Sequence, residues 1–427
     1  MNEFIKRIFG SDLIKSSFYS AVATFVKIVT AFLMSKIIAI KLGPDGMGLI
    51  GQLTNFISIV LILCGGAITN GIVKYLAEYR ASAPEKIAPL MSTSFKLTII
   101  LSVLVGAGLI IFSKYLSTFV LFSPSYAFVF IVFGVTIGLY GLNNLLLSIV
   151  NGYKEYKKFN IISINTSILS LIVSLFFIYR WQVNGALIAL VVNQSVVFIA
   201  TLFFLRKEKW LIRGNFAQSM SRQQINNLSR FALMALVSTA TVPISQMYIR
   251  AHIIHHISLE AAGIWESVNR ISNIYLMFVT TSLTTYYLPK LSELSNERDV
   301  RKEVLKVYKV LMPIVIVSCA AIYLFRMLII KILFTGQFNE ASELFLFQMI
   351  GDMLKIASWI LGFQLVAKAK TKLYITVEVI FSFLFVVFSL VFINKYGLIG
   401  TTYAFALNYL LCLIFMIVVF RKMLFNR

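Results

Sequence analysis

Charged residues are scarce in this sequence: Asp, Glu, Lys and Arg make up 13% of its 427 positions. A soluble chain would carry roughly 25%. Hydrophobic residues make up 59%, and continuous apolar runs near the ~20 residues that cross a bilayer recur along the whole length. A transmembrane β-barrel is excluded, because its strands would alternate apolar and polar residues. The composition therefore predicts an all-α integral membrane protein.

The signatures of several enzyme classes are also missing. There is no glycine-rich phosphate loop ending in Lys-Ser or Lys-Thr and no nucleophile elbow, so neither ATP hydrolysis nor serine-hydrolase chemistry is expected. The longest connection, residues 206–230, has about 25 residues, which is too few for a folded catalytic domain. We expect no enzymatic activity, no catalytic residue and no cofactor.

Cysteine and histidine do not predict a metal centre. The three cysteines each lie in an apolar run, which indicates buried thiols rather than disulfides. His252, His255 and His256 fall in a predicted external loop after the seventh apolar run. A zinc site there would need a fourth ligand that the sequence does not identify, so the role of these histidines stays open.

The apolar runs predict twelve transmembrane helices in two six-helix lobes. The first lobe covers residues 1–205, the second covers residues 229–427, and the basic segment 206–228 is expected to link them on the cytoplasmic side. The expected spans are residues 16–40, 48–76, 93–113, 126–150, 158–179, 184–205, 229–250, 262–288, 305–325, 344–367, 373–393 and 397–420.

The distribution of Lys and Arg predicts the orientation. We place the N-terminus inside and count basic residues at the ends of spans with the adjacent connection. The cytoplasmic connections and both termini then hold 28 of the 39 basic residues. The external connections hold 7, including Arg250, and the remaining 4 lie well inside spans. Basic residues accumulate on the cytoplasmic side of membrane proteins, so both termini are expected in the cytoplasm. This topology also accounts for the net charge of +22 without a nucleic-acid partner.

The two halves resemble each other at a constant offset of 215 residues. An even number of spans in each half predicts a parallel repeat, and transporters built from repeats bind their substrates between them. The matched pairs are Thr24 and Thr239, Gly48 and Gly263, Glu78 and Glu293, Lys157 and Lys372, Gly185 and Gly400, Asn193 and Asn408, and Arg206-Lys207 and Arg421-Lys422.

Lys27 lies near the centre of the first span, where a lysine costs roughly 2.5–3.5 kcal/mol on insertion scales. Small and polar residues share its side of the helix: Ser16, Ser20, Ala23, Thr24, Thr30, Ala31 and Met34. Bulky residues occupy most of the other side: Phe18, Val22, Phe25, Val29, Phe32 and Leu33. We interpret the first side as facing a wet interior. Lys36 lies near the outer end of the same span, where its long side chain can extend to the membrane surface. It is a second candidate for a functional cation.

The eighth span contains Glu266 and Arg270, four residues apart in the favourable order for a helical ion pair. Asn269, Asn273 and three threonines extend a polar stripe along it, and Gln52, Asn55, Ser58 and Thr69 form its counterpart in the second span. Hydrogen bonding between helices and a wet lumen both explain such a stripe.

The tenth span contains Asp352 and Lys355, three residues apart. They can neutralise each other, or Lys355 can contact an anion while Asp352 serves in coupling or gating. With Glu378, the charged residues within spans number four basic and three acidic. This balance favours an anionic ligand, and phosphate in particular.

Six segments resemble the Wzx-type lipid-linked oligosaccharide flippases, in the polysaccharide-transporter branch of the MOP exporter superfamily. They are LGPDGMGLIGQ (42–52), NGIVKYLAEY (70–79), GIWESVNRIS (263–272), YYLPKLSEL (286–294), LFQMIGDMLKI (346–356) and VAKAKTKLYITVEV (366–379). The resemblance covers nearly the whole chain and looks closest to the enterobacterial common antigen and O-antigen translocases.

The resemblance implies twelve helices in two lobes around a V-shaped central cavity that opens alternately to each side. It implies a bacterial inner-membrane protein that moves an undecaprenyl-diphosphate-linked oligosaccharide from the cytoplasmic to the periplasmic leaflet. Cationic residues are expected to engage the diphosphate: Lys27 and Arg270 first, then Lys36, Lys74, Arg250 and Lys355. Asn55 and Asn273 are expected to line the glycan path, and Asp352 and Glu266 to serve in coupling or gating.

Two other functions remain as alternatives. A MATE-like small-molecule antiporter of the same superfamily would show an acidic rather than a basic cavity. A membrane-embedded polysaccharide polymerase would need a large external loop with catalytic side chains, which the sequence lacks. The identity of the glycan, the driving ion, and association with a polysaccharide polymerase and a chain-length regulator are open on the sequence alone; membrane lipids are the expected surroundings.

Overall fold

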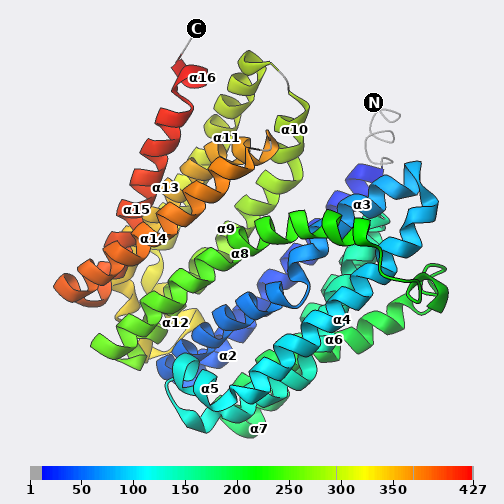
Figure 1. Ribbon diagram of the computed structural model, residues 1–427. Helices are drawn as coiled ribbons and strands as arrows, with labels where there is room; N and C mark the ends of the chain where they lie inside the picture. Colours follow the sequence, from blue (N-terminus) through cyan, green and yellow to red (C-terminus); the bar gives the residue numbers. More distant parts are fainter. Residues whose placement is uncertain (1–11, 295, 369, 426–427) are drawn as a thin grey trace, which may run out of the picture. The chain divides into compact units, whose positions relative to one another are not determined.

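A computed structural model of the chain describes residues 12–294, 296–368 and 370–425. Within these ranges the chain forms helices joined by short connections, with no strand (Figure 1). This confirms the predicted all-α class. Seven described helical stretches are long and apolar enough to cross a membrane: Tyr19–Leu63, Pro84–Ile111, Pro124–Gly152, Tyr156–Leu205, Glu297–Leu324, Ala341–Ala367 and Thr371–Val419.

The helical elements follow one another with few intervening residues. They are α2 (Asp12–Leu63), η1 (Gly66–Ile68), α3 (Thr69–Ser82), η2 (Pro84–Lys86), α4 (Ile87–Ile111), α5 (Ser113–Leu121), η3 (Pro124–Tyr126), α6 (Ala127–Gly152), α7 (Tyr156–Leu205), η4 (Arg213–Asn215), α8 (Arg222–His256), α9 (Leu259–Ser282), the π-helical turn η5 (Leu283–Tyr287), α10 (Leu288–Glu293), α11 (Glu297–Leu324), α12 (Arg326–Leu333), η6 (Gly336–Phe338), α13 (Ala341–Ala367), α14 (Thr371–Tyr396), η7 (Gly397–Ile399), α15 (Gly400–Val419) and α16 (Arg421–Phe425).

The two longest helices, α2 and α7, each contain a sharp break. In α2 the break is at Gly43, which has φ 65° and ψ −168° and is followed by Pro44. Glycine adopts this positive φ without steric cost, and the proline cannot donate the next helical hydrogen bond. In α7 the break is at Trp181 and Gln182, where Gln182 has φ 48°. The expected ends of the first and fifth spans lie close to these two breaks.

The second expected span, residues 48–76, is not a continuous helix, so this part of the prediction is wrong. Helix α2 ends at Leu63, Gly65 has φ 108°, and α3 begins only at Thr69. A left-handed residue cannot continue a right-handed helix, and the glycine pair at positions 65 and 66 supplies this conformation at little cost. The break leaves polar side chains of α3 beside the end of α2.

The prediction of a loop directly after residue 250 is also wrong, because helix α8 continues through this segment. Arg250 and the three histidines belong to α8, which continues to His256. The Nε2 atom of His252 lies 2.9 Å from Oδ1 of Asn394, and the rings of His252 and His256 lie 3.8 Å apart. Imidazole groups are favourable in the last turn of a helix because they interact with the exposed carbonyl groups.

The described chain divides into two compact units. The first contains the residues up to Met34 and Leu53–Ala240, and the second contains Ser35–Gln52 and Thr241–Arg427. Helices α2 and α8 therefore contribute to both units. The expected lobes, in contrast, follow chain order, and their boundaries stay a prediction.

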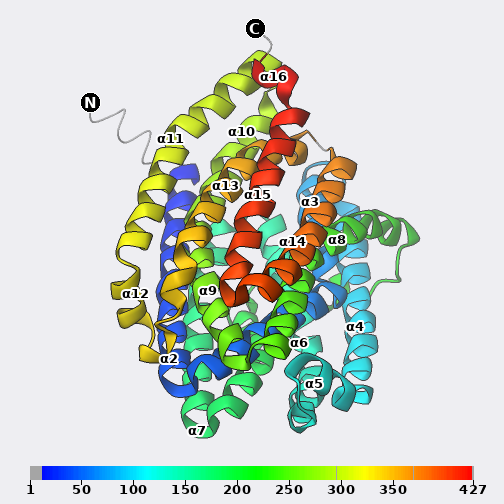
Figure 2. The same cartoon turned by 90° about the vertical axis from the view of Figure 1, so that its left-hand side faces the viewer.

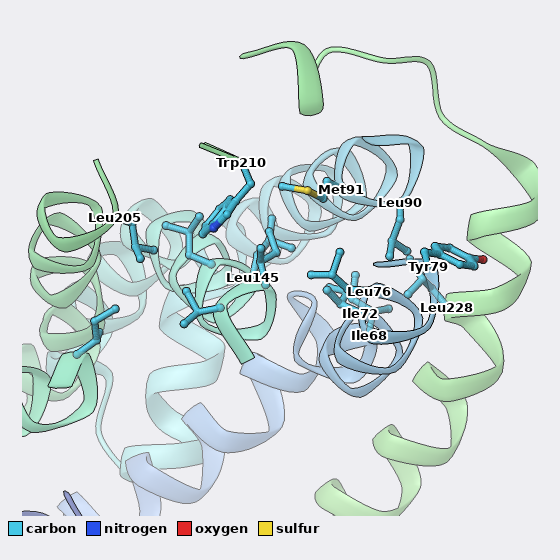
Figure 3. Packing of buried hydrophobic residues seen from close by; sticks show 14 residues of the cluster. Ile68, Ile72, Leu76, Tyr79, Leu90, Met91, Leu145, Leu205, Trp210 and Leu228 are labelled. Atoms are coloured by element: carbon cyan, nitrogen blue, oxygen red, sulfur yellow. The ribbon is translucent and has the colours of Figure 1, made fainter. Parts of the chain in front are cut away.

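The core of the first unit holds α3, α4 and α6 together (Figure 3). Ile72 and Leu76 of α3 and Leu90 of α4 are almost completely buried, together with Leu145 of α6. The segment between α7 and α8 packs on the same cluster through Trp210.

The basic segment between α7 and α8 also makes direct hydrogen bonds to α4. The hydroxyl of Ser92 donates to the carbonyl oxygen of Phe216 at 3.0 Å, and Lys96 Nζ donates to the carbonyl oxygen of Gln218 at 2.6 Å. The amide of Ser221 donates to Thr93 Oγ1 at 3.0 Å. These contacts make the segment an ordered part of the first unit.

In the second unit α13 is the central helix. It contacts α9, α11, α14 and α15, and Figure 2 shows its long side-by-side packing with α15. The arrangement places the charged residues of α9 and α13 among helices rather than in connections.

The two units contain the same turn at positions 215 residues apart. Gln182 has φ 48° and Gly397 has φ 66°. A Cβ atom on Gly185 would lie 1.9 Å from the carbonyl oxygen of Phe177, and one on Gly400 would lie 2.2 Å from that of Phe392. The absence of a side chain at both glycines therefore lets the chain pass close to the carbonyl oxygen of a residue that precedes the turn.

Candidate functional site

A cluster of two arginines and one glutamate lies within the second unit. Arg250 Nη2 is 2.5 Å from Glu266 Oε2, and Arg270 Nε is 2.9 Å from Glu266 Oε1. The predicted pair between Glu266 and Arg270 is thereby confirmed. Arg250 was expected at the external end of the seventh span, and its side chain is only 1% exposed. Buried charges persist in proteins only when they are paired, which Glu266 achieves for Arg250.

The surroundings of Arg250 explain how the chain tolerates this buried charge. Arg250 Nη1 donates to Gln52 Oε1 at 3.4 Å, and the guanidinium carbon lies 5.2 Å from the Trp265 ring centre. A Cβ atom on Gly51 would lie 2.7 Å from the Glu266 carboxylate. Glycine at position 51 thus leaves the room that the ion pair occupies.

The charge of this cluster is not balanced. One carboxylate serves two guanidinium groups, so the formal charge of Arg250, Glu266 and Arg270 is +1. Arg270 bonds to Glu266 through Nε alone, and its two terminal nitrogens have no hydrogen-bond partner among the described residues. Its side chain is 19% exposed. Arg270 is therefore the member of the cluster that can contact an anion without breaking the ion pair.

Asp352 on α13 is fully buried against α9. Its Oδ2 accepts hydrogen bonds from the hydroxyls of Ser272 and Tyr275, each at 2.6 Å. Its Oδ1 has no partner among the described residues, and no lysine or arginine nitrogen of those residues lies within ion-pairing distance. Neutral donors hold the carboxyl directly, and the Lys355 ammonium acts on it only at longer range.

Lys355 does not neutralise Asp352 through a direct ion pair, contrary to the first reading of this pair. Its ammonium group lies 4.8 Å from the ring centre of Trp359, 5.6 Å from that of Phe405 and 5.5 Å from that of Tyr409. Each such contact is worth about 0.5–2 kcal/mol. An aromatic cage therefore stabilises this cation in the second unit.

Lys27 is exposed on the first unit. No carboxylate of the described residues lies within ion-pairing distance of it. Thr24 and Thr30 bond to carbonyl oxygens of their own helix, and Phe25 is 62% exposed. A mid-span cation without a protein counter-ion fits the interpretation that its partner is water or a ligand.

The other expected site residues are scattered. Lys36 and Asn273 are exposed in the second unit. Lys74 is exposed in the first unit, with Nζ 4.9 Å from the ring centre of Tyr75. Asn55 is half-buried, and its Nδ2 has no partner among the described residues. The structure thus brings together Arg250, Glu266 and Arg270 but leaves the roles of all these residues as predictions.

Ser272 and Tyr275 were missed by the sequence reasoning. They lie three residues apart and so share a face of α9, which was a visible signal. Their partner, Asp352, lies about 80 residues further along the chain and could not be inferred from spacing. Groups of three or more metal-binding side chains do not occur in the described part of the chain.

Long apolar helices with charged residues inside them, in two compact units, define a polytopic membrane protein. A solved inward-facing MATE transporter of the MOP superfamily has the same fold, with a TM-score of 0.79 at 15% identity, covering 94% of this chain and 98% of that one. The lipid II flippase MurJ, in an inward closed conformation, gives a TM-score of 0.75 at 15% identity, covering 96% of this chain and 90% of that one. At this identity the similarity concerns the fold alone.

Sequence similarity identifies the family. The chain belongs to the polysaccharide biosynthesis protein family, whose profile matches residues 13–295. The lipid III flippase of Escherichia coli (strain K12) is 30% identical over 401 residues, covering 93% of this chain and 96% of that protein. This confirms the resemblance to the polysaccharide-transporter branch of the MOP superfamily.

Proposed function

We propose that the protein is a flippase that moves an undecaprenyl-diphosphate-linked oligosaccharide from the cytoplasmic to the periplasmic leaflet, by alternating access, for assembly of enterobacterial common antigen or O-antigen. The observation that carries this proposal is the 30% identity to a lipid III flippase along nearly the whole of both chains. The fold alone does not distinguish a flippase from a drug transporter, because solved structures of both kinds share it. The basic residues within the helices favour an anionic substrate over a cationic drug.

The proposed architecture is twelve membrane-spanning helices in two repeated six-helix lobes around a central V-shaped cavity. Three helical stretches, Tyr19–Leu63, Tyr156–Leu205 and Thr371–Val419, are 45, 50 and 49 residues long, about twice what one crossing needs. The matched turns at Gln182 and Gly397 support the repeat.

The proposed ligand of the cationic side chains is the diphosphate. A diphosphate carries about two negative charges, and moving it through hydrocarbon without compensation is prohibitive. Lys27 and Arg270 are the principal candidates, because neither needs to abandon a protein carboxylate to bind an anion. The forked terminal nitrogens of Arg270 suit phosphate oxygens. Lys36, Lys74, Arg250 and Lys355 are secondary, and Asn55 and Asn273 are assigned to the glycan.

Asp352 is proposed as the coupling residue, with Glu266 in gating. An ionised carboxylate without a paired cation is costly in a protein interior, and binding a proton or a sodium ion would remove this cost. The open Oδ1 of Asp352 offers the place for that ion. Charging and discharging this group would change the free energy of the contact between α9 and α13.

The proposed location is the bacterial inner membrane with both termini in the cytoplasm, supported by the distribution of basic residues. A polysaccharide polymerase is proposed as a partner because it would use the flipped oligosaccharide as its substrate, and a chain-length regulator is proposed because it would act together with that polymerase.

Complementation of bacterial strains that lack defined flippases tests the function. We expect this chain to restore one class of surface glycan, and the restored glycan identifies the substrate. Lys114→Ala, which removes an exposed cation of α5, serves as the matched control for variants at Lys27. Failure to restore any glycan, with the protein present in the membrane, would overturn the proposal.

A further inference from the structure

A cavity of about 540 Å³ lies wholly within the first unit. Its walls are the end of α2, η1, α3, α6, the first turn of α7, and α8. The volume is in the range of roughly 300–1,000 Å³ that small-molecule sites occupy. The cavity lies beside the break at Gly65, where the polar residues of α3 follow the end of α2.

The walls of this cavity are held in place by the core of the same unit. Thr69 and Asn70 of α3 line the cavity, whereas Ile72 and Leu76 of the same helix are buried in the core against Leu145 of α6 (Figure 3). Helix α3 therefore separates an apolar core from the cavity. The site is built on helices rather than on loops, which favours a fixed geometry.

The cavity lining is uncharged and combines polar with apolar side chains. None of its residues is Lys, Arg, His, Asp or Glu. A diphosphate would find no cation here, and a cationic drug would find no carboxylate. The polar side chains are three asparagines, four aliphatic hydroxyls and one phenol: Asn70, Asn144, Asn151, Ser58, Thr69, Ser148, Thr239 and Tyr140.

The four aliphatic hydroxyls already donate their protons within the protein. Ser58, Thr69, Ser148 and Thr239 bond to main-chain carbonyl oxygens at 2.9, 2.8, 2.7 and 2.5 Å. Their oxygens can still accept, but the principal donors left in the cavity are amides.

Asn70 on α3 and Asn151 on α6 supply these free amides. Neither side chain is hydrogen-bonded to any residue that the structure describes. Each amide offers two donors and an acceptor, which matches ring hydroxyls that both donate and accept. Tyr140 and Phe159 add aromatic faces, against which the C–H face of a sugar ring can pack.

From this lining we propose that the cavity binds one uncharged sugar ring of the transported glycan. The inference rests on the proposed flippase function and adds a sugar subsite that is separate from the cationic residues assigned to the diphosphate. A uronic acid is excluded from this subsite, because its carboxylate would lose hydration without gaining a cation.

Binding of three water-soluble probes to the purified protein in nanodiscs tests this inference. The probes are farnesyl diphosphate, its glucosyl derivative and its glucuronosyl derivative. The wild-type protein should bind the glucosyl probe more tightly than the other two. Asn70→Ala and Asn151→Ala should each weaken binding of the glucosyl probe roughly 2- to 12-fold, the loss expected for one hydrogen bond, with farnesyl diphosphate unaffected. Asn165→Ala, at an exposed asparagine outside the cavity, is the matched control and should change nothing.

The outcomes separate this inference from the proposed function. If farnesyl diphosphate binds but glucose adds no affinity, or if the variants weaken all three probes equally, the sugar subsite is overturned while the flippase function stands. Equal affinity for the glucosyl and glucuronosyl probes would overturn the exclusion of charged sugars. If the wild-type protein binds none of the probes, the proposed function fails and the sugar subsite fails with it.

Discussion

Replacing Glu266 with glutamine should destabilise the protein strongly. The substitution keeps the size of the side chain but removes the carboxylate that is paired with Arg250, whose side chain is 1% exposed. Leaving a buried charge without its partner typically costs about 3–5 kcal/mol. Because each 1.4 kcal/mol is a factor of ten, the ratio of folded to unfolded protein should fall by roughly two to four orders of magnitude.

Equilibrium unfolding in detergent micelles measures this effect, and the chain supplies a matched control. Lys290 and Glu293 form an ion pair at 3.4 Å whose side chains are 42% and 69% exposed. Glu293→Gln should therefore cost only about 0–1 kcal/mol. The double variant Arg250→Gln/Glu266→Gln should be less destabilised than the sum of its single variants, because the stranded charge is gone. Equal stability of Glu266→Gln and Glu293→Gln would refute this reasoning.

Three further predictions concern transport and topology. Lys27→Ala should weaken binding of a prenyl diphosphate roughly 10- to 150-fold, the loss expected for a charged hydrogen bond, whereas Lys114→Ala should not; normal affinity in a binding assay would remove Lys27 from the site. Asp352→Asn should leave substrate binding intact but abolish the response of transport to an imposed proton or sodium gradient, measured in proteoliposomes; an unchanged response would exclude Asp352 from coupling. Cysteine labelling in whole cells should place Arg213→Cys inside and His255→Cys outside, and the reverse labelling would invert the proposed orientation.

Contacts within one helix were predictable from the sequence. The pair formed by Glu266 and Arg270 follows from their four-residue spacing, and it is present at 2.9 Å. The constant offset of 215 residues paired Gly185 with Gly400, and the structure shows that both glycines lie at a close approach of the chain to an earlier carbonyl oxygen. Composition alone was sufficient for the all-α class, because only helices satisfy the backbone of continuous apolar runs.

Contacts between helices were not predictable. Spacing along α8 says nothing about which helix supplies the partner of Arg250, so the buried ion pair could not be predicted for this residue at the end of a span. One of the two interpretations of Asp352 gave it a partner three residues away on α13, but its hydrogen-bond donors come from α9. The break at Gly65 was visible as a glycine pair within an apolar run, yet single glycines are also tolerated inside helices, and tertiary packing decides between the two.

A leaflet-translocation measurement tests the proposed flippase function directly. Purified protein is reconstituted into liposomes that carry a fluorescent undecaprenyl-diphosphate-linked oligosaccharide, and a membrane-impermeant quencher reports how much of it faces outward over time. Liposomes with the wild-type protein should equilibrate the labelled lipid across the bilayer much faster than protein-free liposomes, whereas those with Lys27→Ala should not. Equal rates with and without the wild-type protein would contradict the flippase function.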